Sequence, residues 1–150
     1  MESLTFAFDS EAGSRPPGFV QDPDSKDAKP VTPGDTSQLS PPLGKVTPPP
    51  KRDEPRHDAA KFSPGRAAQA QKAAVVRSGQ SVTAKGTLDV LRYGRVLKAR
   101  KLVGVRGGGD AFDGVYHVQT ATSHISRGAY SQEFVLVRNG LMSKESTLTT

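Results

Sequence analysis

The sequence contains no cysteine and no tryptophan, and only 6% of its 150 residues are aromatic. Without cysteine there is no disulfide framework, no thiolate metal site and no thiol nucleophile, which excludes zinc-ribbon, iron–sulfur and thiol-enzyme classes. No apolar run approaches the roughly 18 residues that a membrane-spanning helix needs, and the first residues lack a basic stretch followed by an apolar one. We therefore expect a soluble protein with no membrane insertion and no Sec signal.

Charge and proline divide the chain into two halves of different character. Residues 1–60 hold 7 Lys and Arg against 10 Asp and Glu, a net charge of −3, whereas residues 61–150 hold 14 against 5, a net charge of +9. Eleven of the 12 prolines precede residue 61. Proline removes backbone donors and favours extended polyproline II structure, so a disordered Pro-rich linker is predicted over residues 10–62.

One short helix and four strands are expected after this linker. Ser63 and Pro64 are typical of a helix start, Gly79 of its end, and the residues between them are rich in alanine. Beyond Gly79 the alternation of apolar residues predicts strands, and a tight turn at Ser126–Ala129 would join the last two into a hairpin. The predicted strands are residues 82–89, 101–106, 115–125 and 130–138, with a turn at 93–95 and a flexible glycine-rich loop at 107–114.

A further strand is expected at Leu4–Phe8, where bulky apolar residues alternate with small ones. The fold class is therefore mainly β with one short helix. Residues 63–140 would form the folded β domain together with its leading helix, and residues 141–150 a flexible tail. Because a domain of about 80 residues buries a limited share of its surface, we expect an obligate partner or an oligomer.

Few residues carry the patterns that catalysis or metal binding requires. Gly107–Gly109 is not followed by Gly-Lys-Ser/Thr or by a helix, so it predicts a strand connection and not a phosphate site. His117 and His124 are an odd number of residues apart on one strand, which would point them to opposite faces in structural, hydrogen-bonded roles. Asp110 and Asp113 share one mobile loop, so a hydrolase built on them is the weaker alternative. We expect no catalytic residue, no metal and no cofactor.

The clearest candidate interaction surface is basic. Six cations within 15 residues would contact a phosphate backbone in a salt-sensitive way, but Tyr93 alone lies among them, whereas single-strand binders use several stacking aromatics. A solvated face that meets an acidic protein partner is the favoured interpretation, and a small basic nucleic-acid-binding β domain is the alternative. The six cations are Arg92, Arg95, Lys98, Arg100, Lys101 and Arg106.

Several stretches within residues 68–140 together carry a family resemblance, and the tract from Gly104 to Phe134 is the most specific. These stretches are Val82–Asp89, Leu91–Leu97, Leu102–Gly109, Phe112–Val118, His124–Ile125 and Arg127–Phe134. Their order resembles the C-terminal part of the phage late control protein D family, the baseplate hub of contractile phage tails. Relatives of that family serve contractile injection systems and form the valine-glycine-repeat spike of type VI secretion.

The resemblance implies a tail-tube-like β-barrel domain in a structural, non-enzymatic protein. Its expected partners are further copies of itself, as a trimer, and the tail tube and spike proteins, with no small-molecule substrate. It would be made in the cytoplasm and assembled into a virion tail or a contractile injection particle. Longer hubs carry an earlier barrel, so the strand within residues 1–9 would be a remnant of that preceding domain.

The resemblance also implies roles for individual residues. Gly104 would let chains approach closely, Asp113 and Gly114 would form the turn into the third strand, and Gly128 would supply a positive φ in the hairpin. His124 would form hydrogen bonds. The expected core or interface anchors are Tyr116, Tyr130 and Phe134.

Overall fold

The computed structural model describes residues 3–13, 18–21, 26–31, 41–52 and 62–145. Of these residues, 48% lie in strands and 16% in helices, which confirms the mainly β class. They form two compact units that are described separately below. The first, the sheet unit, comprises residues 1–9, 42–47 and 81–150, and the second, the helix unit, comprises residues 10–41 and 48–80.

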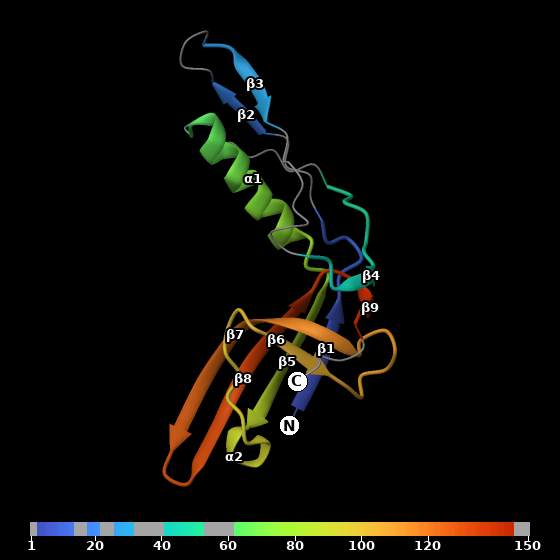
Figure 1. The fold of residues 1–150 in the computed structure, drawn as a ribbon, viewed down its shortest axis with the longest axis vertical. Helices are drawn as coiled ribbons and strands as arrows, with labels where there is room; N and C mark the ends of the chain where they lie inside the picture. Colours follow the sequence, from blue (N-terminus) through green and yellow to red (C-terminus); the bar gives the residue numbers. More distant parts are fainter. Residues whose placement is uncertain (1–2, 14–17, 22–25, 32–40, 53–61, 146–150) are drawn as a thin grey trace. The chain divides into compact units, whose positions relative to one another are not determined.

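Five antiparallel strands in the order β1-β5-β8-β7-β6 form the sheet unit's main sheet, which curls into half a barrel (Figure 1). The four strands predicted after Gly79 are confirmed to within one residue at each end. The five strands are β1 (Ser3–Phe8), β5 (Val82–Asp89), β6 (Leu102–Val105), β7 (Gly114–Ser126) and β8 (Ala129–Arg138).

β1 is an edge strand of this sheet, although a long stretch of sequence separates it from its neighbour. It pairs with β5 over its full length, from Ser3 opposite Thr87 to Phe8 opposite Val82. The strand predicted at Leu4–Phe8 is thus confirmed. Its side chains Leu4 and Phe6 pack against the core of the sheet unit.

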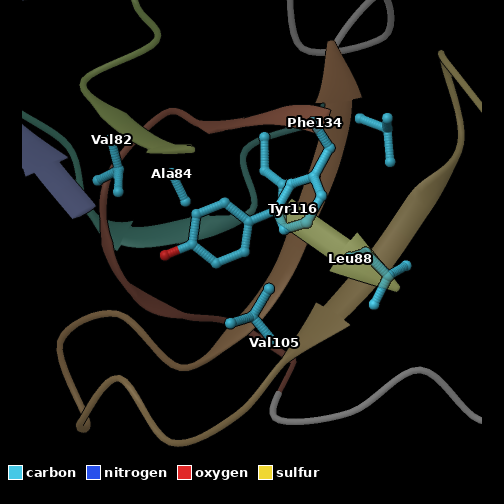
Figure 2. Packing of buried hydrophobic residues seen from close by; sticks show 8 residues of the cluster. Val82, Ala84, Leu88, Val105, Tyr116 and Phe134 are labelled. Carbon is cyan, nitrogen blue, oxygen red and sulfur yellow. The ribbon is translucent and has the colours of Figure 1, made fainter. Parts of the chain in front are cut away.

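The core of the sheet unit lies on one face of the sheet. Tyr116 is fully buried there, and its hydroxyl donates to the backbone oxygen of Phe112 at 2.6 Å. Figure 2 shows the Tyr116 ring between Ala84 and Val105, with Phe134 beside it. Each large apolar side chain buried in this way contributes about 1.5–3 kcal/mol. The buried cluster comprises Val82, Ala84, Leu88, Val105, Tyr116, Val118, Phe134 and Leu136.

A β-bulge at Gln119 interrupts the pairing of β7 with β8. The extra residue reverses the alternation of side chains along β7. His117 and His124 consequently lie opposite Val137 and Ser131, which are an even number of residues apart on β8 and share a face. The prediction that the two histidines point to opposite faces was therefore wrong.

A second, two-stranded sheet of the sheet unit joins β4 (Gly44–Val46) to β9 (Leu141–Ser143). Two backbone N–H groups at the start of β4 donate to Oδ1 of Asn139, at 2.9 and 3.0 Å. The expected flexible tail at residues 141–150 therefore differs from the structure, because residues 141–143 are held by this pairing. Residues 146–150 lie outside the described part of the chain.

The helix unit contains a hairpin of β2 (Gly18–Gln21) and β3 (Ala28–Val31), against which α1 (Pro64–Ser78) packs (Figure 1). The helix starts at Pro64 after Ser63 and is followed by Gly79, as predicted. Along the described residues no helix is both long and apolar enough to cross a membrane.

Where residues 10–62 are described, they differ from the predicted disordered linker. They form β2, β3 and β4, and Val20 of β2 is buried with Ala67 of α1 in a small core. Small residues make this packing possible, since a side chain at Gly18 would overlap Gln71 of the helix. Residues 14–17, 22–25, 32–40 and 53–61 of the predicted linker lie outside the described part.

Candidate interaction surface

The six predicted cations lie on α2 (Val90–Tyr93), on the connection that follows it and around β6. We call residues 90–106 the basic platform. It contains no Asp or Glu, and all six cationic side chains are exposed. Within the ranges that the structure describes, no ion pair joins any of them to a carboxylate. Their charge is therefore available to a partner.

The platform starts with the short helix α2, which was not predicted and which ends where the predicted turn at residues 93–95 begins. The carboxylate of Asp89 accepts hydrogen bonds from the backbone N–H groups of Leu91 (3.0 Å) and Arg92 (3.2 Å), which caps α2. Gly94 ends the helix with a φ of +76°, and its N–H donates to the oxygen of Val90 at 2.8 Å. Both ends of the helix are therefore fixed.

A buried amide fastens the middle of the platform to the sheet. The side chain of Gln132 on β8 accepts from the N–H of Leu97 (2.8 Å) and donates to its oxygen (3.2 Å). Two backbone hydrogen bonds of 2.8 Å also join Val118 of β7 to Arg100 and Lys101. Sequence reasoning missed Gln132, although a glutamine between Tyr130 and Phe134 on the core face of a strand is a usable signal for a buried polar contact.

Exposed apolar side chains alternate with the cations of the platform. Leu91 is 65% exposed, Tyr93 49% and Val96 46%. Next to them is a pocket of about 230 Å³, lined by apolar side chains of β1, β5, β6 and β8 together with Tyr93 and Leu97, and Arg106 is its one charged lining residue. The pocket is smaller than the roughly 300–1,000 Å³ of typical small-molecule sites, so its size suits a side chain of a protein partner.

Another cation of the same unit, Arg138 at the end of β8, has the opposite surroundings. It is 1% exposed, and its guanidinium lies 4.5 Å from the centre of the Tyr116 ring. Its nitrogens donate to the backbone oxygens of Gly140 (2.7 Å), Asp113 (3.0 Å) and Ala111 (2.7 Å). Burial lowers the pKa of Arg138, and the neighbouring Tyr116 and Asp113 oppose that shift. No sequence pattern distinguished this arginine from the exposed ones.

Arg138 holds the glycine-rich loop between β6 and β7 in place. Within this loop, the carboxylate of Asp113 accepts from the N–H of Gly108 at 2.7 Å, and the ring of Phe112 stacks on Phe6 with centres 4.9 Å apart. The expectation of a flexible, unsupported loop therefore differs from the structure. The Asp113 carboxylate organises its own loop, while Asp110 is exposed.

The other residues singled out from the sequence occupy different environments. Tyr116 and Phe134 are core residues, and Tyr130 is half-buried, with its hydroxyl 3.3 Å from that of Ser123. Gly128 has a φ of +82° in the turn between β7 and β8. Gly104 has open space where a side chain would stand, so no close approach among the described residues requires a glycine there.

The turn into β7 depends on Gly114. Its φ of +120° is disfavoured for residues with a side chain, and a Cβ there would overlap the side chain of Ser143 in β9. The same Ser143 hydroxyl accepts from the N–H of Val115 at 3.2 Å. Gly114 thus lets β9 approach the start of β7.

The two histidines have different surroundings. Nε2 of His117 is buried without a hydrogen-bond partner in the described structure, and burial lowers its pKa. Nε2 of His124 is exposed and 3.7 Å from the Glu133 carboxylate. Among the described residues, no three or more His, Cys, Asp or Glu side chains are placed so that they could hold a metal ion.

Comparison with known proteins adds no identification. A scan against protein-family models finds no match, and a search of curated proteins finds no significantly similar sequence. The residues and their geometry therefore carry the functional argument.

Proposed function

We propose that the chain is a non-enzymatic structural component of a contractile phage tail or injection-system baseplate, a hub that links the tail tube to the spike. The order of motifs in residues 82–134 supports this family assignment, and the mainly β half-barrel is compatible with it. The observation that carries the proposal is the open sheet: among the described strands, β1 and β6 each have one paired neighbour.

Open strand edges invite pairing with another chain, and closure of a barrel removes them. In sequence, β1 is flanked by Glu2 and Asp9, whereas β6 is flanked by Lys101 and Arg106. These opposite charges favour β1 of one copy beside β6 of the next. Such a head-to-tail contact closes into a ring when its rotation permits, and a trimer is the ring that we propose.

In this proposal the chain acts through rigid assembly, with strands completed by neighbouring copies and charged faces setting their register. Its partners are other copies of itself and the tube and spike proteins. It has no small-molecule substrate, no catalytic residue and no cofactor, and it is built in the cytoplasm into a tail or injection particle.

Light scattering tests this proposal on the full chain, alone and mixed with the spike protein encoded beside it. We expect a trimer, or a stable complex with the spike. Reversing the charges that flank β6, with Lys101→Glu and Arg106→Glu, should shift the mass toward a monomer, whereas Arg127→Glu in the β7–β8 turn should leave it unchanged. A folded parent chain that stays monomeric and ignores the spike would contradict the hub.

A second candidate is a small basic nucleic-acid-binding β domain, which the unpaired cations of the platform favour. Binding to DNA would then weaken steeply with salt. It would also be lost when Arg95, Arg100 and Arg106 are neutralised together, and the absence of either effect rejects this candidate.

A further inference from the structure

We infer that the basic platform and the pocket beside it form a docking site for an acidic protein segment that carries a bulky apolar side chain. This inference goes beyond the proposed hub. It concerns α2 and the connection that follows it, whose cations Arg92, Arg95, Lys98 and Arg100 are not the ones that flank β6 in the proposed ring.

The positive charge of the platform favours an acidic partner. The platform carries six cations and no carboxylate, and no ion pair within its described surroundings compensates them. Like charges held together in one segment repel each other, and a partner rich in carboxylates relieves that repulsion. Opposite charge also speeds association and sets the orientation of docking. The occupant is therefore acidic.

The backbone of the platform is held in place at three points. The Asp89 cap, the left-handed Gly94 and the Gln132 amide fix the backbone of the platform before any partner arrives. A surface that is already ordered loses less entropy on binding. The fastening of this exposed segment at three points indicates a preformed binding surface.

The exposed apolar side chains of the platform favour a protein partner over nucleic acid. Leu91 and Val96 are exposed among the cations, and a phosphate backbone offers such side chains nothing to pack against. Tyr93 is the one aromatic residue of the platform, whereas single-strand binders stack successive bases on several. The adjoining pocket of about 230 Å³ suits an apolar anchor of a protein segment, the usual centre of a protein interface.

Fluorescence anisotropy tests the inference on the full chain with three labelled probes. The probes are a peptide in which Glu alternates with Leu, a polyglutamate peptide of equal charge, and oligothymidylate. We expect the Glu-Leu peptide to bind about tenfold more tightly than polyglutamate, since it offers leucine side chains that can be buried against the platform and in the pocket. Binding of both peptides should weaken as NaCl is raised.

Variants locate the site. The triple variant Arg92→Glu, Arg95→Glu and Lys98→Glu should lose both peptides, and Leu91→Ser should weaken the Glu-Leu peptide alone. Arg127→Glu, an exposed cation outside the platform, is the matched control and should bind normally. Circular dichroism establishes that each variant is folded, and light scattering of the same samples reads ring assembly separately.

Two results would overturn the inference. One is tighter binding of oligothymidylate than of the Glu-Leu peptide, abolished by the same triple variant, which would assign the platform to nucleic acid. The other is a folded parent chain that binds neither peptide at low salt.

Discussion

Arg138 and the six cations of the basic platform, all in the sheet unit, have opposite surroundings. Arg138 is buried against Tyr116, and three backbone oxygens accept hydrogen bonds from its guanidinium. The six cations of the basic platform are exposed and joined to no carboxylate in the described structure. Arg138 is therefore part of the folded core, whereas the charges of the platform cations remain exposed to a partner.

The free-energy cost of burying a charge explains why Arg138 and the platform cations differ in their contacts. Taking a cation out of water costs several kcal/mol, so a buried arginine persists only where hydrogen bonds and ring contacts compensate it. The contacts of Arg138 meet that condition. Exposed cations stay hydrated and contribute little to folding, and like charges in one segment slightly oppose it.

Replacing Arg138 should have the largest effect. Arg138→Met leaves the oxygens of Ala111, Asp113 and Gly140 without their donors, and we expect a loss of about 3–5 kcal/mol in the free energy of unfolding. Urea denaturation followed by circular dichroism measures it. Arg138→Lys is the control, because an ammonium keeps the charge but not the planar fork, and should recover part of the loss. A loss below about 1 kcal/mol for Arg138→Met would show that the buried network does not hold the loop.

The next largest loss of stability is expected at one of two glycines that lie on either side of the loop between β6 and β7. Gly114→Ala introduces a Cβ at a positive φ and against Ser143, so we expect a loss of about 2–3 kcal/mol in urea denaturation. Gly104→Ala places a Cβ in open space and should change stability by no more than about 0.5 kcal/mol. Equal effects of the two substitutions would refute the structural distinction between them.

A smaller effect is expected at the amide that fastens the platform. Gln132→Leu removes both hydrogen bonds to Leu97, at a cost of about 1–2 kcal/mol, and should speed hydrogen exchange of the Leu97 amide. Gln119→Leu makes the same chemical change at an exposed position and should leave that exchange rate unchanged. Unaltered exchange in the Gln132 variant would mean that the platform is held by other contacts.

Local sequence patterns predicted the elements of the sheet unit well. Alternation placed β5 through β8 within a residue of their ends, and Ser63, Pro64 and Gly79 marked the helix. The caps differ in detail from the usual chemistry, since the Ser63 side chain makes no capping hydrogen bond and Gly79 has an ordinary helical φ of −71°. The preferences of neighbouring residues for helix or strand were therefore sufficient to predict where these elements begin and end.

Features that depend on residues distant in sequence were not predictable in this way. β1 finds its partner across a long stretch of sequence, and β4 pairs with β9 at the other end of the chain. The bulge at Gln119 inverted the inference about the histidines, because one extra residue changes the alternation. The basic cluster was visible from composition, but its fastening by Gln132 and its contrast with Arg138 arise only from the tertiary fold.

The free energy of unfolding of the triple variant Arg92→Glu, Arg95→Glu and Lys98→Glu decides whether the platform cations are needed for folding. Exposed surface substitutions usually change stability by no more than about 0.5 kcal/mol, and relief of repulsion among like charges acts in the stabilising direction. We therefore predict that urea denaturation gives a value equal to that of the parent chain, or higher. A loss of more than about 2 kcal/mol would instead show that these cations stabilise the fold, and they could not then be assigned to a binding surface alone.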